Sequence, residues 1–298
     1  MARAEVSTAA PVAEDTIAPP RPWRDSLGMF FANATAAVGL VLLLAITALA
    51  VVGPWFYPVA PFELAWAPLS PPGQAGFLLG TDYLGRDLLA GVIHGGRATL
   101  AVGLAAASLS VVIGIGVGAL AGFYRGWVEE ILMRFTELFQ VLPTLLFAMV
   151  IVGLFGASLP MVAGAIGIVS WPVVARLTRG EFLRLSQVDY VGAARAAGAT
   201  NAWLITRVIL PNALPTLVVQ GALIVGVAIL FEAGLSFLGL GDPNVMSWGL
   251  MIGSNRQYLL EAWWPVTFPG LMVFLTVLSI SLVGDGLNDA LNPRLRSR

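Results

Sequence analysis

Six apolar segments, each close to the length of a helix that crosses a bilayer, constrain this chain more than any other feature. They lie at 36–56, 98–122, 138–155, 159–175, 213–231 and 263–284. An α-helix of about 20 apolar residues spans the roughly 30 Å of hydrocarbon, and it pairs its backbone polar groups internally. The chain has 58% hydrophobic and 11% charged residues. In a typical soluble domain about 25% of the residues are charged, so this chain is too apolar for that class. The sequence therefore predicts an all-α, polytopic membrane protein with six transmembrane helices.

The first segment has two interpretations. Ala48-Leu49-Ala50 resembles the cleavage site of a signal peptide. However, the preceding polar stretch is long for a signal peptide, and the apolar run continues beyond this site to Trp55. These flanks favour an uncleaved transmembrane anchor over a removed leader.

The placement of arginine predicts how the bundle is oriented. All 16 basic residues are Arg. If the N-terminus is cytoplasmic, only Arg86, Arg97 and Arg256 lie outside, and the remaining 13 of the 16 lie inside. The positive-inside rule requires this bias. Because six crossings return the chain to its starting side, we expect both termini in the cytoplasm.

This topology divides the chain into five parts. They are a disordered cytoplasmic tail at 1–35, a first transmembrane helix at 36–56, an external loop at 57–96, a transmembrane core at 97–288 and a cytoplasmic tail at 289–298. The first tail is polar and carries several prolines, which disfavours a packed core. A cytoplasmic loop at 176–212 within the core exceeds the usual length of a simple connection, about 12–15 residues at most, and is therefore expected to carry function.

Missing residue types exclude several chemistries. The chain has no Lys, so it cannot form a P-loop, which needs a phosphate-binding lysine, or a lysine Schiff base. It has no Cys and a single histidine, His94, which removes disulfides, thiolate nucleophiles and sites with several His ligands. We therefore expect no catalytic residue, no metal site and no nucleic-acid partner.

The loop at 176–212 predicts two short helices. The run from Ala193 to Ala197 favours helix, and Gly198 can stop it in a left-handed turn. Asn201 can cap a second helix, which Pro211 would end. Apolar anchors for a docked partner are available at Tyr190, Trp203, Leu204 and Ile205. From physics alone, an ordinary amphipathic helix resting on the membrane is an equally good interpretation.

A resemblance changes that balance. The stretch resembles the cytoplasmic EAA loop of ATP-binding-cassette importer permeases, whose pattern is Glu-Ala-Ala, three residues, Gly, nine residues, Ile, any residue and Leu-Pro. The matching residues are Ala193, Ala194, Gly198, Leu210 and Pro211. Gly192 replaces the expected Glu and Val208 the expected Ile, so no ion pair is assigned at Gly192.

Four further motifs narrow the resemblance to the dipeptide/oligopeptide permease family, and to its second permease subunit. They lie at 79–87 (LGTDYLGRD), 232–241 (EAGLSFLGLG), 247–249 (SWG) and 284–294 (GDGLNDALNPR). The resemblance covers residue 78 to the C-terminus. It implies the fold of a type I ABC importer permease in a bacterial inner membrane, which translocates small peptides or related solutes.

The same resemblance implies partners. They are a second permease, two ATP-binding subunits and an external solute-binding protein, with lipid around the bundle. ATP and magnesium would bind in the ATP-binding subunits, which agrees with the missing P-loop lysine. The residues of the coupling loop that would meet these subunits are Tyr190, Ala193, Ala194, Gly198, Trp203, Leu210 and Pro211.

Three other features have open roles. Glu232 either lines the pathway or gate, or has a structural partner at the external interface, because a charge within a span usually faces protein or water. Asp82, Arg86 and Asp87 begin an expected short amphipathic helix in the external loop, with Leu84, Leu88, Leu89, Val92 and Ile93 on its apolar side. That helix is an external gate, a contact for the binding protein or a plain structural lid. A stripe of Gly114, Gly118 and Gly122 favours helix packing over pore lining.

Two other classes of function are alternatives. A secondary transporter would couple through intramembrane acids and broken helices, and Glu232 is its candidate acid in the later spans. That model leaves the large cytoplasmic loop unexplained. An intramembrane enzyme is more distant, because His94 lies outside the predicted spans.

Overall fold

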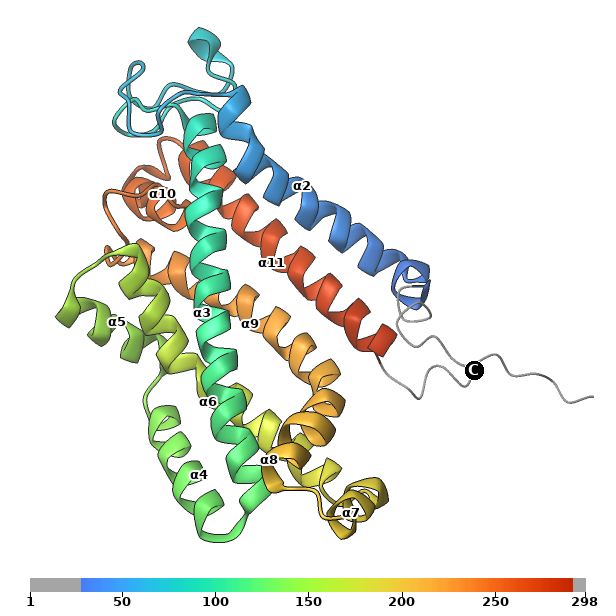
Figure 1. Ribbon diagram of the computed structural model, residues 1–298. Coiled ribbons are helices and arrows are strands. Elements are labelled where there is room, and N and C mark those ends of the chain that lie inside the picture. Colours follow the sequence, from blue (N-terminus) through green and yellow to red (C-terminus); the bar gives the residue numbers. More distant parts are fainter. Residues whose placement is uncertain (1–27, 292–298) are drawn as a thin grey trace, which may run out of the picture.

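The computed structural model describes residues 28–291, which form helices joined by turns and loops (Figure 1). The main helices are α2 (Ala34–Phe56), α3 (Leu88–Tyr124), α4 (Gly126–Val141), α5 (Thr144–Phe155), α6 (Leu159–Leu185), α7 (Asp189–Ala196), α8 (Asn201–Trp203), α9 (Leu210–Phe237), α10 (Trp248–Asn255) and α11 (Trp264–Leu291). Within the described residues, two isolated bridges join Leu64 to Arg86 and Thr81 to Asp87. The predicted all-α class is confirmed.

Five helical runs are long and apolar enough to cross a membrane: α2, α3, α6, α11 and the run Asn201–Phe237 that contains α9. Helices α4 and α5 also pass this test together, but an 82° bend separates them. The predicted number of six spans is reached when this bent pair is counted as one.

The third span, predicted at 138–155, is wrong as a single straight helix. Helix α4 ends at Val141 and α5 begins at Thr144. Between them Leu142 is extended, with φ −84° and ψ 135°, because a residue that precedes proline is disfavoured in the α region. Pro143 also lacks the N–H that would continue the helical ladder. Hydropathy alone carries no information about this change of direction.

Helix α3 lies at the centre of the fold and packs closely along α6. Gly114, Gly118 and Gly122 lie on the face of α3 that meets α6. A Cβ atom built on any of the three would come closer than 3.0 Å to an α6 atom, including backbone atoms of Trp171, Ala175 and Arg179. The glycine stripe therefore allows two backbones to approach, as the packing interpretation predicts.

Helix α2 lies outside this centre, against α11 and α3 (Figure 1). It contains Pro54, which has no N–H to donate to the carbonyl of Ala50, four residues earlier. Arg97 of α3 replaces that donor: its Nε atom lies 2.9 Å from Ala50 O, and its Nη2 atom lies 2.5 Å from Val51 O. One arginine thus joins two helices and satisfies the carbonyl that proline leaves free.

The two ends of the described chain pack against each other. Residues 28–32 are helical, and Phe30 is buried in a cluster with Ala36 and Ala290. A disordered tail as far as residue 35 is therefore wrong for 28–35, because burial of Phe30 favours order there. The rest of that predicted tail lies outside the described residues. Helix α11 likewise continues to Leu291, and the predicted C-terminal tail beyond it lies outside the described residues.

The short amphipathic helix predicted within 57–96 is also wrong. Its apolar residues Leu88, Val92 and Ile93 form the first turns of α3, which runs without interruption to Tyr124. Asp87 starts this helix as its N-cap, since its side chain accepts hydrogen bonds from the N–H groups of Leu89 and Ala90. The polar residues near position 97 make the sequence look interrupted there. In the structure, Arg97 lies inside α3 and donates hydrogen bonds to α2.

Candidate functional site

The loop at 176–212 forms helical segments joined by a tight turn at one end of the molecule. Helix α6 continues to Leu185, and α7 follows from Asp189 to Ala196. Gly198 then adopts φ +90°, a conformation that glycine reaches without the steric penalty of a Cβ atom. The predicted left-handed stop at Gly198 is confirmed.

The second helix begins one residue earlier than expected. Thr200, not Asn201, is its N-cap, because Thr200 Oγ1 accepts a hydrogen bond from Trp203 N at 3.3 Å. Asn201 is instead the first helical residue. Both residue types are favourable caps, so composition did not distinguish between the two neighbours.

Pro211 does not end this helix. Residues Leu204–Ile209 form a π-helical turn, in which Leu210 N donates to Ile205 O, five residues earlier. The Nδ2 atom of Asn212 then donates to Val208 O at 2.6 Å. The wider turn lets the helical run pass Pro211, whose missing N–H would otherwise pair with a carbonyl one turn earlier. The helical run consequently continues for 37 residues, from Asn201 to Phe237.

An apolar cluster beneath the loop fixes it to the long helices. Leu204 is fully buried there with Phe182 of α6, Val191 of α7 and Leu217 of α9. The expectation that Leu204 serves as an anchor for a partner is therefore wrong, because it fills the interior of this cluster. A displacement of α7 would therefore push on α6 and α9 through tightly packed side chains.

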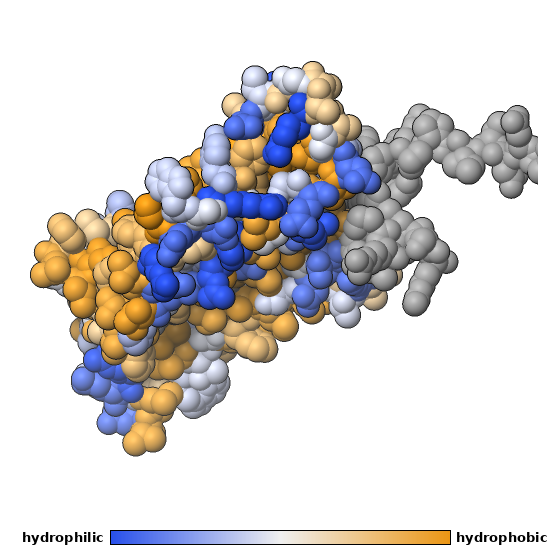
Figure 2. Space-filling model, turned by 90° about the horizontal axis from the view of Figure 1, so that it is seen from below, coloured by the Kyte–Doolittle hydropathy of each residue, from blue (hydrophilic) through white to orange (hydrophobic). Residues whose placement is uncertain are grey.

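The outer surface of the loop combines small and large apolar residues. We call the predicted coupling residues Tyr190, Ala193, Ala194, Gly198, Trp203, Leu210 and Pro211 the loop face; all are exposed except Ala194 and Leu210, which are half-buried against the cluster around Leu204. Tyr190 is 43% exposed and Trp203 is 49% exposed, although hydrophilic residues gather on this end of the molecule (Figure 2). A shallow cavity of about 400 Å³ lies between Ala194, Gly198 and Trp203. Exposed aromatic residues around a concave, small-residue surface are typical of an interaction site.

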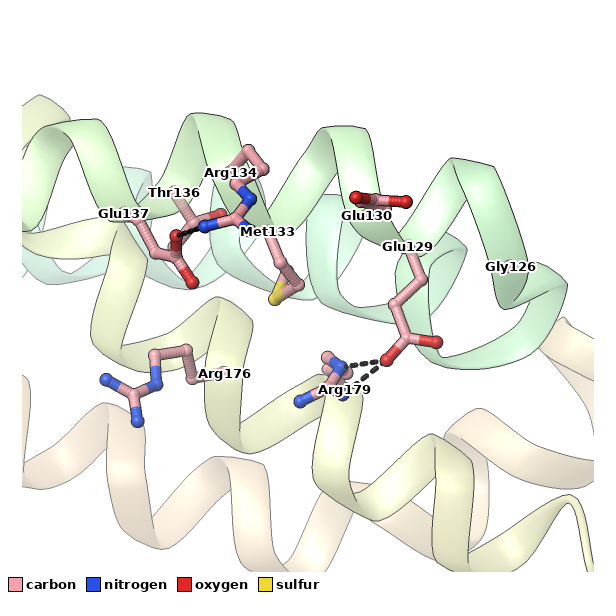
Figure 3. Close-up of a pocket in the computed structure, with 9 residues that line it drawn as sticks. All are labelled: Gly126, Glu129, Glu130, Met133, Arg134, Thr136, Glu137, Arg176 and Arg179. Carbon is pink, nitrogen blue, oxygen red and sulfur yellow. Dashed lines mark hydrogen bonds and ion pairs between the residues drawn. The ribbon is translucent and has the colours of Figure 1, made fainter.

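A charged cleft lies between α4 and α6 (Figure 3), with a volume of about 480 Å³. Glu129 of α4 pairs with Arg179 of α6, with 2.6 Å between Oε1 and Nε, and Arg176 Nη1 donates to Gln140 Oε1 at 3.1 Å. Arg134 pairs with Glu137 along α4 at 3.1 Å. The bonds of Arg179 and Arg176 tie α4 to α6. Sequence reasoning missed the cleft, although the spacing of acids in 126–141 was a usable signal of an amphipathic helix.

At the opposite end, Asp82 and Asp87 organise the segment that precedes α3. Asp82 Oδ1 accepts hydrogen bonds from Leu84 N and Arg86 N, both at 2.8 Å. Asp87 Oδ1 accepts from Leu89 N at 2.9 Å, and its other oxygen accepts from the hydroxyl of Tyr57. Both aspartates are buried. Their contacts are those of residues that shape a turn and cap a helix.

Burial changes the proton affinity of two groups in this segment. Desolvation raises the pKa of Asp82, although backbone donors and Arg86 oppose the shift. Desolvation also raises the pKa of Tyr57 to about 12, with further contributions from its hydrogen bond to Asp87 and the charge of that carboxylate. The guanidinium of Arg86 lies 5.0 Å from the centre of the Phe62 ring, which is within range of a cation–π contact.

Glu232 lies near the end of α9 and is only 2% exposed. Its Oε1 atom accepts hydrogen bonds from Ser236 Oγ at 2.9 Å and Ser247 Oγ at 2.8 Å. Thr99 Oγ1 of α3 lies 3.5 Å from Oε2. Of the two roles left open for this residue, the contacts are those of the structural one.

Three of the sequence motifs meet around α10. Tyr83 N donates to Asn255 Oδ1 at 3.1 Å, and Trp264 Nε1 donates to Thr81 O at 3.1 Å. Trp248 Nε1 donates to Val92 O at 2.9 Å. The motifs at 79–87, 232–241 and 247–249 are therefore parts of one assembly. The fourth motif lies elsewhere, since Gly286 packs against Ala36 and Phe30.

Two further cavities lie along α3. One, of about 510 Å³, is an apolar groove between Leu104 of α3 and Val218 of α9. The other, of about 530 Å³, lies between Phe62, His94 and Met246. Among residues 28–291, no group of three or more His, Cys, Asp or Glu side chains is placed to hold a metal ion.

Two protein families together match most of the chain. Residues 114–297 match the binding-protein-dependent transport system inner membrane component family. This chain belongs to that family. Residues 21–72 match the N-terminal transmembrane domain of oligopeptide transport permease C. The first match contains the loop face, the charged cleft and Glu232, and the second contains α2.

Curated relatives align with nearly the whole of this chain. It is 42% identical to the di/tripeptide transport system permease protein DppC of Pseudomonas aeruginosa, over 97% of both chains. It is 35% identical to the dipeptide transport system permease protein DppC of Alkalihalophilus pseudofirmus, over 96% of this chain and 95% of the relative. It is 37% identical to the oligopeptide transport system permease protein OppC of Haemophilus influenzae, over 92% and 89%.

A solved structure confirms the fold. A chain of the MetNI methionine ABC transporter, crystallised in inward-facing conformations, superposes with a TM-score of 0.58 at 19% identity. The alignment covers 68% of this permease and 96% of the MetNI chain. The family member thus has the predicted type I ABC importer permease fold.

Proposed function

We propose that this chain is the membrane-spanning permease subunit of an ATP-driven importer for small peptides or related solutes. It would lie in a bacterial inner membrane, with the α7 end and both termini in the cytoplasm and the α10 end outside. The names of the relatives support the cargo class, and the bias of arginine toward the α7 end supports the orientation. The observation that carries the proposal is the loop face, an exposed apolar surface built on an ordered turn.

The proposed partners follow from the P-loop lysine that this chain lacks and from the loop face that it exposes. A second permease subunit completes the pathway, and two ATP-binding subunits supply the energy, because a chain without lysine has no phosphate-binding P-loop. ATP and magnesium bind in those subunits. An external solute-binding protein delivers cargo at the α10 end. The family description, a component of a binding-protein-dependent system, supports this set.

The loop face is where one ATP-binding subunit docks. The side chains of Tyr190 and Trp203 supply apolar contact area, and Ala193 and Gly198 let the partner approach the backbone closely. When the subunit closes on ATP, it displaces α7. The packed cluster around Leu204 passes that displacement to α6 and to the helix that begins at Asn201. Movement at the loop face thereby reaches the membrane-spanning helices.

Secondary transport through Glu232 is not favoured. A proton-coupling acid must exchange with water during the cycle. Glu232 is enclosed by Ser236, Ser247 and Thr99, and it lines none of the four cavities described above.

The decisive experiment reconstitutes the permease with its partner subunits in liposomes and measures uptake of radiolabelled dialanine. Uptake is expected to require ATP inside the liposomes together with the binding protein outside, and to persist when an ionophore removes ion gradients. The permease without its partners is expected to hydrolyse no ATP. Uptake driven by a proton gradient without ATP would refute the proposal.

A further inference from the structure

Glu232 determines the orientation of the hydroxyl groups that hold the first turn of α10. Thr99 Oγ1 accepts a hydrogen bond from Trp248 N at 3.2 Å, and Ser247 Oγ accepts from Leu250 N at 3.1 Å. Each hydroxyl has one proton to donate, and in both cases the acceptor within reach is Glu232. The carboxylate therefore connects α9, α3 and the beginning of α10.

Helix α10 packs closely against the helices on both of its sides. A Cβ atom on Gly249 would lie 2.7 Å from Ala233 Cα, and one on Gly253 would lie 2.9 Å from Phe237 Cα. These two glycines place α10 directly against the last turns of α9. On its other side, the ring of Trp248 fills the space above Gly96, where a Cβ atom would lie 2.9 Å from it.

The helix that carries Glu232 also reaches the loop face. The helical run from Asn201 to Phe237 has 37 residues, which corresponds to a length of about 55 Å at 1.5 Å per residue. Its first residues follow the turn at Gly198, and its last turns hold α10. A shift of this helix along its axis would therefore move whatever Glu232 fixes to it.

We propose that Glu232 is a positioning residue that makes α10 and the end of α9 one mechanical unit. This inference rests on the proposed function. Displacement of the loop face by an ATP-binding subunit moves the long helix, and the bonds from Glu232 to Ser247 and Thr99 make α10 follow it relative to α3. Glu232 acts through its two carboxylate oxygens, which accept these hydrogen bonds, and it carries neither cargo nor protons.

This role makes opposite predictions for two substitutions. Glu232→Gln keeps an acceptor oxygen for Ser236 and Ser247, and its amide can donate to Thr99, so the connection survives. Glu232→Ala leaves the hydroxyl groups without their acceptor in a buried position. Loss of such bonds weakens the connection by about tenfold or more. A proton carrier would instead be inactivated by either change.

The test uses the complete reconstituted importer and the variants Glu232→Gln, Glu232→Ala and Glu261→Ala, the last as a control that removes an exposed acid from the same side. ATP hydrolysis, peptide uptake and thiol labelling are measured together. Labelling reports a cysteine at Leu250, half-buried on α10, in a chain without native cysteine. An impermeant maleimide is added from outside.

With Glu232→Ala, we expect hydrolysis to continue, uptake per ATP to fall by about tenfold and labelling at position 250 to rise by a similar factor. Glu232→Gln and Glu261→Ala are expected to remain within about threefold of wild type, because their hydrogen bonds at α10 are intact. Ser247→Ala, which removes the bond to Glu232 and the N-cap bond to Leu250 but keeps the carboxylate bond to Thr99, should lie between them and serves if Glu232→Ala does not assemble.

The inference is overturned if Glu232→Gln is as damaging as Glu232→Ala, or if both Glu232→Ala and Ser247→Ala transport like wild type. Failure of the wild-type complex to take up peptide with ATP would instead count against the proposed function. The wild-type measurement thus separates the two failures.

Discussion

The α7 end and the α10 end of this permease are built in different ways. The α7 end is formed largely by one continuous stretch, which turns at Gly198 and in which Tyr190 and Trp203 are exposed. The α10 end is assembled from segments more than 100 residues apart, joined by hydrogen bonds from Tyr83 to Asn255, from Thr99 to Glu232 and from Trp264 to Thr81. One end is an exposed apolar surface, and the other is a set of buried contacts between helices. Their responses to mutation should differ accordingly.

The largest expected difference between the two ends is the side of the membrane on which they lie. Cysteines introduced at Gln74 and Gln187, both exposed, report the two ends separately. An impermeant maleimide added to intact cells should label position 74 fully and position 187 only after permeabilisation, because the arginine bias places the α7 end inside. The reverse pattern would invert the proposed orientation.

At the α7 end, Gly198→Val should disrupt coupling strongly. A β-branched residue at φ +90° is strained by about 1–3 kcal/mol, so the turn should change shape. We expect at least a tenfold loss of ATP-dependent uptake, with normal membrane insertion. Gly192→Ala is the matched control, because a Cβ atom there meets nothing within 4 Å. Equal activity of the two variants would show that the turn does not couple.

At the α10 end of α2, Arg97→Met should lower stability rather than affinity for a partner. The carbonyl of Ala50, whose residue is 2% exposed, would lose its donor at a cost of about 1–3 kcal/mol. In a Pro54→Ala background the new N–H can donate to this carbonyl, so the same substitution should cost less. Thermal unfolding of the four proteins in detergent measures this coupling, and additive effects would contradict it.

Asp87→Ala should have a smaller effect at the same end. Loss of the N-cap of α3 is expected to reduce the free energy of unfolding by about 0.5–2 kcal/mol. Asp87→Asn should retain most of the stability, because Asn caps helices equally well. Thermal unfolding compares the two variants. If Asp87→Asn unfolds as early as Asp87→Ala, the charge matters more than the cap.

The smallest effect is expected in the charged cleft. Glu129→Gln breaks an ion pair whose arginine is 37% exposed, and partly exposed pairs contribute about 1 kcal/mol or less. Thermal unfolding should therefore change little, and ATP-driven uptake should remain close to wild type. A large loss of uptake with unchanged stability would show that the cleft takes part in transport.

Local signals predicted the α7 end better than the α10 end. The turn at Gly198 was predictable because it depends on residues next to it in sequence. The partners of Glu232 were not, since Thr99 and Ser247 lie 133 and 15 positions away and no periodic pattern connects them. Hydropathy located the spans but not the bend before Pro143, because two short apolar helices and one long helix have the same composition. Hydropathy also places a boundary at Arg97, although α3 begins at Leu88 and continues through that residue.

The contact between Pro54 and Arg97 has a consequence for the order in which substitutions can accumulate. If the proline is replaced first, the helix regains its own donor and the arginine becomes dispensable for Ala50. If the arginine is replaced first, a buried carbonyl is left without a donor until the proline also changes. The two paths lead to the same double variant, but only the first avoids a destabilised intermediate. Sequences that drift at these two positions should therefore lose the proline before the arginine.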